Sequence, residues 1–212
     1  MKVTFPITSK LAAFFILVSL VTPLTGRPCE AQFRTISEKP PVGKPAPDFE
    51  LLDYNGKSIK LSKYQKKFVV LEWFSDECPF VKKHYNSGNM QALQKEYVKK
   101  GVVWLTICSS AKDKPGFHSN DDHKAVLKNW NANMSDFLID ADGDVGRMYG
   151  SKNTPTMYVI AKDGTLIYEG AIDDRRDPDP ESVKGANNYV RAALDEAMAG
   201  KPVTVSATRP YG

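Results

Sequence analysis

The feature that most constrains this 212-residue sequence is an apolar, β-branched run that leads to a single cysteine and a proline. Residues 68–71 predict a buried strand, and a lysine-bearing helical pattern begins after Cys78-Pro79. Proline suits the first position of a helix, so this pair predicts Cys78 as the N-cap. The unpaired N–H groups and the macrodipole of a helix N-terminus favour a thiolate over a thiol. We therefore expect Cys78 to be a reactive cysteine, with its sulfur facing the N–H groups of Phe80 and Val81.

Strand patterns lie on both sides of this run. The turn Asn55-Gly56 is typical of a hairpin, and Asp163-Gly164 predicts a second one. The predicted strands are residues 48–52, 58–61, 68–73, 102–107, 137–139, 157–160 and 166–168. Their order, interleaved with helices, indicates an α/β protein: a central mixed β-sheet with helices on both faces and an N-terminal β-hairpin.

The helical patterns carry clear start and stop signals. The breaker cluster at residues 86–89 predicts that the helix after Cys78 is interrupted there. Asn89 is expected to cap a second helical segment, which ends at Gly101. The remaining predicted helices are residues 121–131, 142–149 and 182–199. In the first of these we expect Ala125, Val126 and Trp130 to face inward. Residues 173–180 predict a charged loop.

The N-terminal region has the pattern of a secretory signal peptide. Lys2 and Lys10 precede an apolar core at residues 11–21, which is too short for a bilayer core of about 30 Å. An uncleaved membrane anchor is the alternative. The predicted organisation is a signal peptide at 1–31, a linker at 32–42, a domain at 43–200 and a tail at 201–212. Export, to a periplasm or out of the cell, implies an oxidising compartment, where a reactive cysteine needs a disulfide partner or a reductant.

Composition and charge exclude several classes of function. The net charge is +4, of which residues 1–31 carry half, and the lysines form no long run, so the sequence does not predict a nucleic-acid binder. Three cysteines are too few for a disulfide scaffold. The acidic run at residues 140–144 lacks the glycine and glutamate of a calcium loop, and we expect a turn and a helix N-cap there. No metal and no cofactor are predicted.

The order of the elements resembles the thioredoxin fold, with a cysteine after the first core strand and Thr154-Pro155 before the second hairpin. Residues 42–49, followed by a hairpin, look like the start of the alkyl hydroperoxide reductase/thiol-specific antioxidant (redoxin) branch. The resemblance covers residues 42–200. It implies a cis-proline at Pro155 that packs beside Cys78, so that Thr154 and Pro155 line the substrate pocket.

The motif itself is similar to a peroxiredoxin-like group with a single Cys-Pro-x-Val-x-Lys motif, here Cys78, Pro79, Val81 and Lys83. Thioredoxins have a second cysteine where Val81 stands, so no disulfide can close within the motif. Ser75 fits the hydroxyl that peroxiredoxins place three residues before the cysteine, and it would polarise the substrate. Leu71 replaces their proline. An arginine near the sulfur, a further peroxiredoxin feature, could come from Arg147, Arg175 or Arg176.

Cys108 is the candidate resolving cysteine. It ends a strand expected to lie parallel to the one before Cys78, so both strand ends meet at one rim. A bridge needs Cα atoms within about 7 Å, which would require loop movement. A buried structural cysteine is the other interpretation. Related proteins often continue into a Gly-Cys-containing end that these 212 residues lack, so we expect the resolving thiol to come from Cys108 or from another protein.

Other candidates near the cysteine are weaker. Lys82 follows Cys78 by four residues on the same helical face, where it either holds the thiolate or is solvated. A lysine at this position also rules out the Cys-x-x-x-Cys copper site that other proteins of this fold carry. His84 lies about 240° round the helix and should point elsewhere. His118 and His123 are predicted at the surface.

These observations predict an exported thiol-dependent redox protein, a thiol oxidoreductase or peroxiredoxin-like antioxidant enzyme. The Cys78 thiolate would attack a peroxide or a disulfide, and an external thiol or thioredoxin-like reductant would restore it. One alternative is a non-catalytic thioredoxin-fold binding module for exported or envelope proteins. Another is a one-cysteine exchange protein that forms mixed disulfides with its partners.

Overall fold

The computed structural model describes residues 1–4 and 39–212. Contacts within the chain divide it into two units, Met1–Phe33 and Arg34–Gly212. The apolar core predicted for a signal peptide, and Cys29, lie outside the described residues. In the described part of the chain, no helix combines the length and the apolar character needed to cross a membrane.

Residues 39–212 are built on a seven-stranded mixed sheet in the order β2-β1-β5-β4-β3-β6-β7. The strands are β1 Glu50–Asp53, β2 Ser58–Lys60, β3 Val69–Trp73, β4 Val103–Cys108, β5 Asp136–Ile139, β6 Thr156–Ile160 and β7 Leu166–Gly170. β3 pairs parallel with β4, and β4 with β5, while the other pairs are antiparallel. The predicted mixed sheet and N-terminal hairpin are thereby confirmed.

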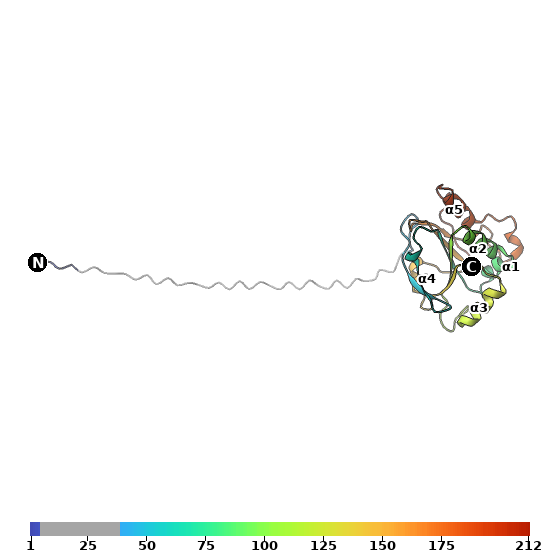
Figure 1. Ribbon diagram of the computed structural model, residues 1–212, viewed down its shortest axis with the longest axis horizontal. Helices are drawn as coiled ribbons and strands as arrows, with labels where there is room; N and C mark the ends of the chain where they lie inside the picture. Colours follow the sequence, from blue (N-terminus) through green and yellow to red (C-terminus); the bar gives the residue numbers. More distant parts are fainter. Residues whose placement is uncertain (5–38) are drawn as a thin grey trace. The chain divides into compact units, whose positions relative to one another are not determined.

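Helices cover both faces of the sheet. Successive side chains of β3 point to opposite faces, and all five are buried, so each face is covered by a core. The helices are α1 Pro79–Asn86, α2 Asn89–Lys99, α3 Asn120–Asn129, α4 Asp144–Tyr149 and α5 Tyr189–Met198. Val70 and Phe74 belong to a core shared with α1, α2, α3 and α5. Leu71 and Trp73 belong to a second core shared with α4. Figure 1 shows α4 on one side of the sheet and α1, α2 and α3 on the other.

Several helix details differ from the sequence-based expectations. The N-cap of α2 is Gly88, at φ +76°, because the Asn89 side chain bonds the His84 ring instead. α5 begins at Tyr189, where the Asn188 side chain accepts the backbone N–H of Arg191. A short 3-10 turn, Pro180–Val183, occupies the start of the longer helix that was predicted.

The face of α3 that meets the core is also different. Its buried residues are His123 and Leu127, four positions apart, whereas Ala125 is exposed. Val126 and Trp130 pack against the core from the side, as expected. The prediction of a surface position for His123 is therefore wrong, and its ring packs against Phe137 at 4.9 Å.

Residues in the predicted tail pack against the domain. Ala207 forms a parallel bridge to Glu169, and the Thr208 N–H donates to the Glu169 carbonyl at 3.0 Å. The backbone passes so close that a Cβ atom on Gly170, at φ +138°, would overlap Thr208. Tyr211 is buried, so this segment contributes to the core.

Candidate active site

Cys78 is the N-cap of α1, and Pro79 occupies the first helical turn, as the sequence predicted. The Cys78 N–H donates to the Ser75 carbonyl at 3.1 Å, and the Cys78 carbonyl accepts the Lys82 N–H at 2.9 Å. These two bonds close the turn after β3 and open the helix. They hold the half-buried thiol at the edge of the sheet where β3 ends.

The Cys78 sulfur contacts the segment before β6. Its Sγ donates to the Thr154 carbonyl oxygen at 2.9 Å. The Thr154–Pro155 peptide bond is cis, as the resemblance implied. β6 starts at Thr156 opposite Trp73 of β3, so strand pairing carries Thr154 and Pro155 to the cysteine. The Cys78 side chain makes no capping hydrogen bond to α1 and bonds Thr154 instead, so the expectation that the sulfur faces the helix N–H groups is wrong for the thiol.

Ser75 and Cys108 both face the loop that follows β4. A Cβ atom on Gly116 would overlap the Ser75 hydroxyl and lie 2.9 Å from Ser110 Oγ, so this loop packs tightly on Ser75. Cys108 is 3% exposed, and its Sγ lies 3.5 Å from the Gly116 carbonyl. Burial raises the pKa of the Cys108 thiol. Its environment is thus that of a buried cysteine, and a resolving role stays a prediction.

An open cleft of about 280 Å³ lies beside Thr154 at the same rim. It combines the ends of β3 and β4 with the segment before the cis-proline. Its lining residues are Trp73, Phe74, Ser109, Ser110, Ser151, Lys152, Asn153 and Thr154. One of these residues, Thr154, contacts the Cys78 sulfur through its carbonyl oxygen.

Behind α1 lies a buried polar cluster that the sequence analysis did not find. It consists of Lys83, His84, Asp173 and Tyr211, with exposed fractions between 0 and 7%. Lys83 Nζ lies 3.8 Å from the Asp173 carboxylate and donates to the Arg175 carbonyl at 2.5 Å. The Tyr211 hydroxyl donates to the same carboxylate. α1 is therefore tied to the loop after β7 and to residue 211.

The hydrogen bonds of this cluster define the state of His84. Burial, together with Lys83, lowers the pKa of His84 to about 3, so the ring is neutral at pH 7. Its Nδ1 accepts from the Asn89 amide at 3.0 Å, so Nε2 carries the proton and donates to the Tyr211 hydroxyl at 3.1 Å. Burial raises the pKa of Tyr211, which stays protonated and donates to Asp173. The His84 ring therefore bonds Tyr211 and is not directed at Cys78, as its helical position predicted.

A second buried network surrounds Glu72, the β3 residue six positions before Cys78. Its carboxylate is fully buried and accepts four hydrogen bonds of 2.7–3.1 Å. The donors are Tyr85, Gln94, Trp104 and Thr106. Burial raises the pKa of Glu72, while these donors act in the opposite direction. The network joins β3, β4, α1 and α2 directly under the cysteine helix.

The other charged candidates are either exposed to solvent or paired with a nearby aspartate. Lys82 is exposed, as a solvated lysine would be. The Arg147 and Arg175 side chains pair with Asp144 at 2.5 Å and with Asp174 at 3.6 Å.

Histidine and aspartate near the rim also form local pairs. His118 is part-buried, and its Nε2 lies 2.9 Å from the Asp76 carboxylate. Asp140 accepts the N–H groups of Val145 and Gly146, as expected for a turn and helix N-cap. Within the described residues, no group of three or more histidine, cysteine, aspartate or glutamate side chains is arranged to hold a metal ion.

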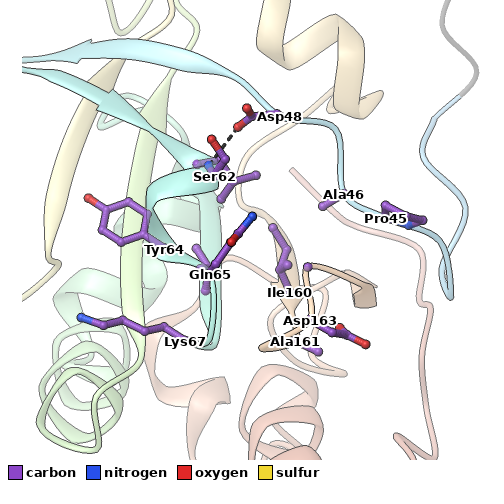
Figure 2. Close-up of a pocket in the computed structure, with 13 residues that line it drawn as sticks. Pro45, Ala46, Asp48, Ser62, Tyr64, Gln65, Lys67, Ile160, Ala161 and Asp163 are labelled. Carbon is purple, nitrogen blue, oxygen red and sulfur yellow. Dashed lines mark hydrogen bonds between the residues drawn. The ribbon is translucent and has the colours of Figure 1, made fainter.

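A separate apolar pocket of about 160 Å³ lies at the opposite end of the sheet. Its wall includes Val69 and Ile160, which pair where β3 begins and β6 ends. Figure 2 shows Tyr64 and Lys67 on one side and Asp163 on the other. This pocket is remote from Cys78, so we do not assign it to the cysteine chemistry.

Comparison with known proteins agrees with this geometry. Thiol-disulfide oxidoreductase ResA of Bacillus thuringiensis subsp. konkukian is 30% identical over 135 residues, which cover 64% of this chain and 72% of that protein. An uncharacterized conserved protein from Geobacillus kaustophilus is 27% identical, with a TM-score of 0.67 over 80% of this chain and 87% of that one.

The fold has a further solved counterpart. The thioredoxin domain of a thiol-disulfide oxidoreductase from Bacteroides vulgatus is 15% identical, with a TM-score of 0.51 over 69% of this chain and 98% of that one. This likeness shows the thioredoxin fold. The model of the AhpC/TSA family matches residues 42–169, from the segment before β1 to β7. The chain therefore belongs to the AhpC/TSA family, with a thioredoxin-like fold.

Proposed function

We propose that the protein is an exported thiol oxidoreductase that reduces peroxides or disulfides through Cys78. The observation that carries this proposal is the position of the thiol: at the N-cap of α1, 2.9 Å from Thr154 and next to a cis-proline. Family membership and a relative named as a thiol-disulfide oxidoreductase support thiol redox chemistry. The predicted signal peptide supports export.

Deprotonation changes the surroundings of the sulfur. The thiol donates its proton to the Thr154 carbonyl, whereas a thiolate has no proton to donate and is repelled by that oxygen. The N-terminus of α1, whose backbone N–H groups receive no capping bond from the Cys78 thiol, then becomes the favourable direction. The thiolate therefore turns from Thr154 towards the helix, which makes the sulfur available for attack.

With a peroxide, the thiolate attacks one oxygen of the O–O bond. The S–O bond forms, the O–O bond breaks and an alkoxide or hydroxide leaves with a proton from solvent, so the peroxide is reduced to alcohol or water. Cys78 is oxidised to a sulfenic acid. One external thiol converts it to a mixed disulfide and releases water, and a second thiol restores Cys78 and leaves as a disulfide. We place Ser75 as the hydroxyl that polarises the peroxide.

With a disulfide, the thiolate attacks one sulfur and the other leaves as a thiolate. Cys78 then forms a mixed disulfide, which Val81 cannot resolve as a second cysteine of the motif would. Cys108 is a poor candidate for resolving this mixed disulfide, because it is buried and its pKa is raised. An external thiol or thioredoxin-like reductant therefore completes the cycle.

The test is stopped-flow reaction of the reduced protein with hydrogen peroxide and with a small aromatic disulfide. Mass spectrometry then identifies the oxidised residue. We expect the wild-type protein to consume at least one of the oxidants with modification at Cys78. Cys78→Ser should abolish the reaction while its circular dichroism and melting curve stay those of a folded protein. A Cys108→Ser variant that still turns over with added thiol supports the external route.

Two outcomes contradict the proposal. Equal activity in wild-type and Cys78→Ser proteins would remove Cys78 from the chemistry. A folded wild-type protein that reacts with neither oxidant, and whose Cys78 is alkylated slowly, would favour the non-catalytic binding module instead.

A further inference from the structure

Gly212 lies directly against the carbonyl group that accepts the Cys78 thiol. A Cβ atom on Gly212 would overlap the Thr154 oxygen and lie 2.8 Å from the Thr154 carbonyl carbon. Gly212 has φ +145°, which L side chains rarely adopt, and the Asn153 side-chain amide lies 3.5 Å from its carbonyl. The backbone of residue 212 thus occupies the space next to the group that contacts the reactive sulfur.

Tyr211 anchors this backbone to the cysteine helix. Its ring meets Phe80 of α1 edge-on at 5.4 Å between centroids, and Lys83 Nζ lies 5.3 Å above it. Its hydroxyl bonds Asp173 and His84 within the buried cluster. The chain end marked C in Figure 1 accordingly lies beside α1. The anchor is therefore attached to the same helix that carries Cys78 at its start.

The segment is fixed a second time, upstream of Tyr211. Thr208 Oγ1 accepts the Ala171 N–H at 2.9 Å and contacts the Tyr168 hydroxyl at 2.7 Å. The bridge between Ala207 and Glu169 adds backbone hydrogen bonds along β7. Residues 209 and 210 therefore lie between the two fixed points, Thr208 and Tyr211, and Gly212 follows against Thr154.

We propose that residues 209–212 form a barrier on one side of Cys78 that admits small oxidants and excludes polypeptide disulfides. The inference rests on the proposed function, because it concerns which substrates reach the sulfur. A polypeptide substrate has to lay its own backbone beside the attacked sulfur, and exposed backbone edges are the usual place for such pairing. Here the Thr154 edge is already occupied by Gly212.

A small oxidant has another route. The cleft lined by Trp73, Ser109 and Thr154 reaches the same rim and has a volume of about 280 Å³. That is close to the lower limit of about 300 Å³ for small-molecule sites and far below the space that a folded partner needs. The barrier therefore selects for size and leaves the approach of a peroxide unchanged.

The test compares two maleimides with the same reactive group on the full-length, reduced protein. One is N-ethylmaleimide, and the other carries a long polyethylene glycol chain. Peptide mapping by mass spectrometry follows the loss of unmodified Cys78. The variants are Gly212→Ala, whose Cβ would force the segment away from Thr154, and Tyr211→Ala, which removes the anchor. The control is Gly200→Ala, which also has positive φ but nothing within 4 Å of its Cβ position.

We expect the ratio of the bulky to the small rate constant to rise about tenfold or more in both variants, equivalent to about 1.4 kcal/mol. It should stay at the wild-type value in the control. A model peptide disulfide should react faster with Gly212→Ala in the same way, with the hydrogen peroxide rate unchanged. If Tyr211→Ala loses its fold, Gly212→Ala decides the question, because the three atoms nearest its Cβ position all belong to Thr154.

An unchanged ratio in Gly212→Ala would overturn the barrier. The result is independent of the redox proposal, because alkylation requires only a thiol. A protein inert to peroxide and disulfide whose alkylation ratio still rises in Gly212→Ala would retain the barrier and lose the proposed function. A protein that reacts with peroxide or disulfide at Cys78, and whose alkylation ratio does not change in Gly212→Ala, would support the proposed function and contradict the barrier.

Discussion

The Cys78 sulfur lies 2.9 Å from the Thr154 carbonyl oxygen, although the two residues are 76 positions apart in the sequence. Antiparallel pairing of Trp73 with Thr156 brings them together, because Trp73 ends β3 shortly before Cys78 and Thr156 begins β6 shortly after Thr154. The site is therefore a product of sheet register. A shift of β6 against β3 would separate the thiol from the cis-proline and leave both elements otherwise intact.

The ion pair between Lys83 and Asp173 should contribute strongly to stability. Both side chains are at most 1% exposed, so Lys83→Met leaves a buried carboxylate without a cation and should cost about 3–5 kcal/mol of unfolding free energy. Adding Asp173→Asn removes the unpaired charge and should recover part of that loss. The exposed pair of Lys184 and Glu181 provides the control, and Lys184→Met should leave the unfolding free energy nearly unchanged, because solvent screens an exposed ion pair. Urea unfolding measures all four proteins, and a Lys83→Met loss as small as the control would contradict the prediction.

Sequence patterns were sufficient for the fold and for the thiol. Apolar runs located the seven strands of the described region, and the Cys78-Pro79 pair located the start of α1. They could not reveal the polar cluster, because a helical pattern treats Lys83 and His84 as surface residues. Their burial depends on Asp173 and Tyr211, which lie about 90 and 130 residues away in the chain. No local signal separates the buried Lys83 from its exposed neighbour Lys82.

The orientation of the Cys78 sulfur could not be predicted from the sequence either. Helix polarity correctly predicts Cys78 as N-cap, but the thiol proton is satisfied by Thr154, and only the folded chain places that carbonyl nearby. In the same way, the burial of His123 and the exposure of Ala125 depend on which face of α3 packs on the core, where the His123 ring meets Phe137 at 4.9 Å. Both errors arise where tertiary contacts override a local pattern.

Glu72 should tolerate loss of its charge better than loss of its oxygens. Glu72→Ala removes the acceptor of four buried hydrogen bonds, and of the four donors Gln94 keeps the Tyr85 hydroxyl as a second partner. At about 1–3 kcal/mol for each unpaired donor before relaxation, the variant should be destabilised by several kcal/mol. Glu72→Gln keeps one oxygen for the Trp104 and Thr106 donors, while the Tyr85 hydroxyl can rotate to accept from the new amide. Thermal melting should therefore rank Glu72→Gln well above Glu72→Ala. Equal melting temperatures for the two variants would show that the hydrogen bonds do not determine stability here.

Cys108 should react much more slowly than Cys78 in the folded protein. It is 3% exposed and its pKa is raised, so both access and thiolate fraction oppose alkylation. We expect iodoacetamide to modify Cys78 at least about a hundredfold faster at pH 7.5, since Cys108 reacts only through local opening. Mass spectrometry after timed quenching measures both rates, and denaturant should make them similar. Comparable rates in the native protein would mean that Cys108 is accessible, and would strengthen its claim as the resolving cysteine.

His84 should make the protein less stable as the pH falls below neutrality. Its pKa is about 3 in the folded protein against 6.5 for an ordinary histidine, because burial and Lys83 oppose its charge. Between these values the unfolded chain binds more protons, so stability is fully present above pH 6.5 and declines towards pH 3, by up to about 1.4 kcal/mol per pH unit.

The matched variant is His84→Gln, which cannot take up a proton and can still bond Tyr211 and Asn89. Urea unfolding at several pH values from 7.5 to about 4 should give a shallower slope for this variant than for the wild-type protein, by up to about 1.4 kcal/mol per pH unit. His123, whose pKa burial also lowers, contributes equally to both proteins and cancels in the difference. Parallel curves for the two proteins would mean that folding leaves the pKa of His84 unchanged, which would contradict the prediction. Two-bond ¹H–¹⁵N spectra at pH 7 provide the independent check, since they should show a neutral ring protonated at Nε2.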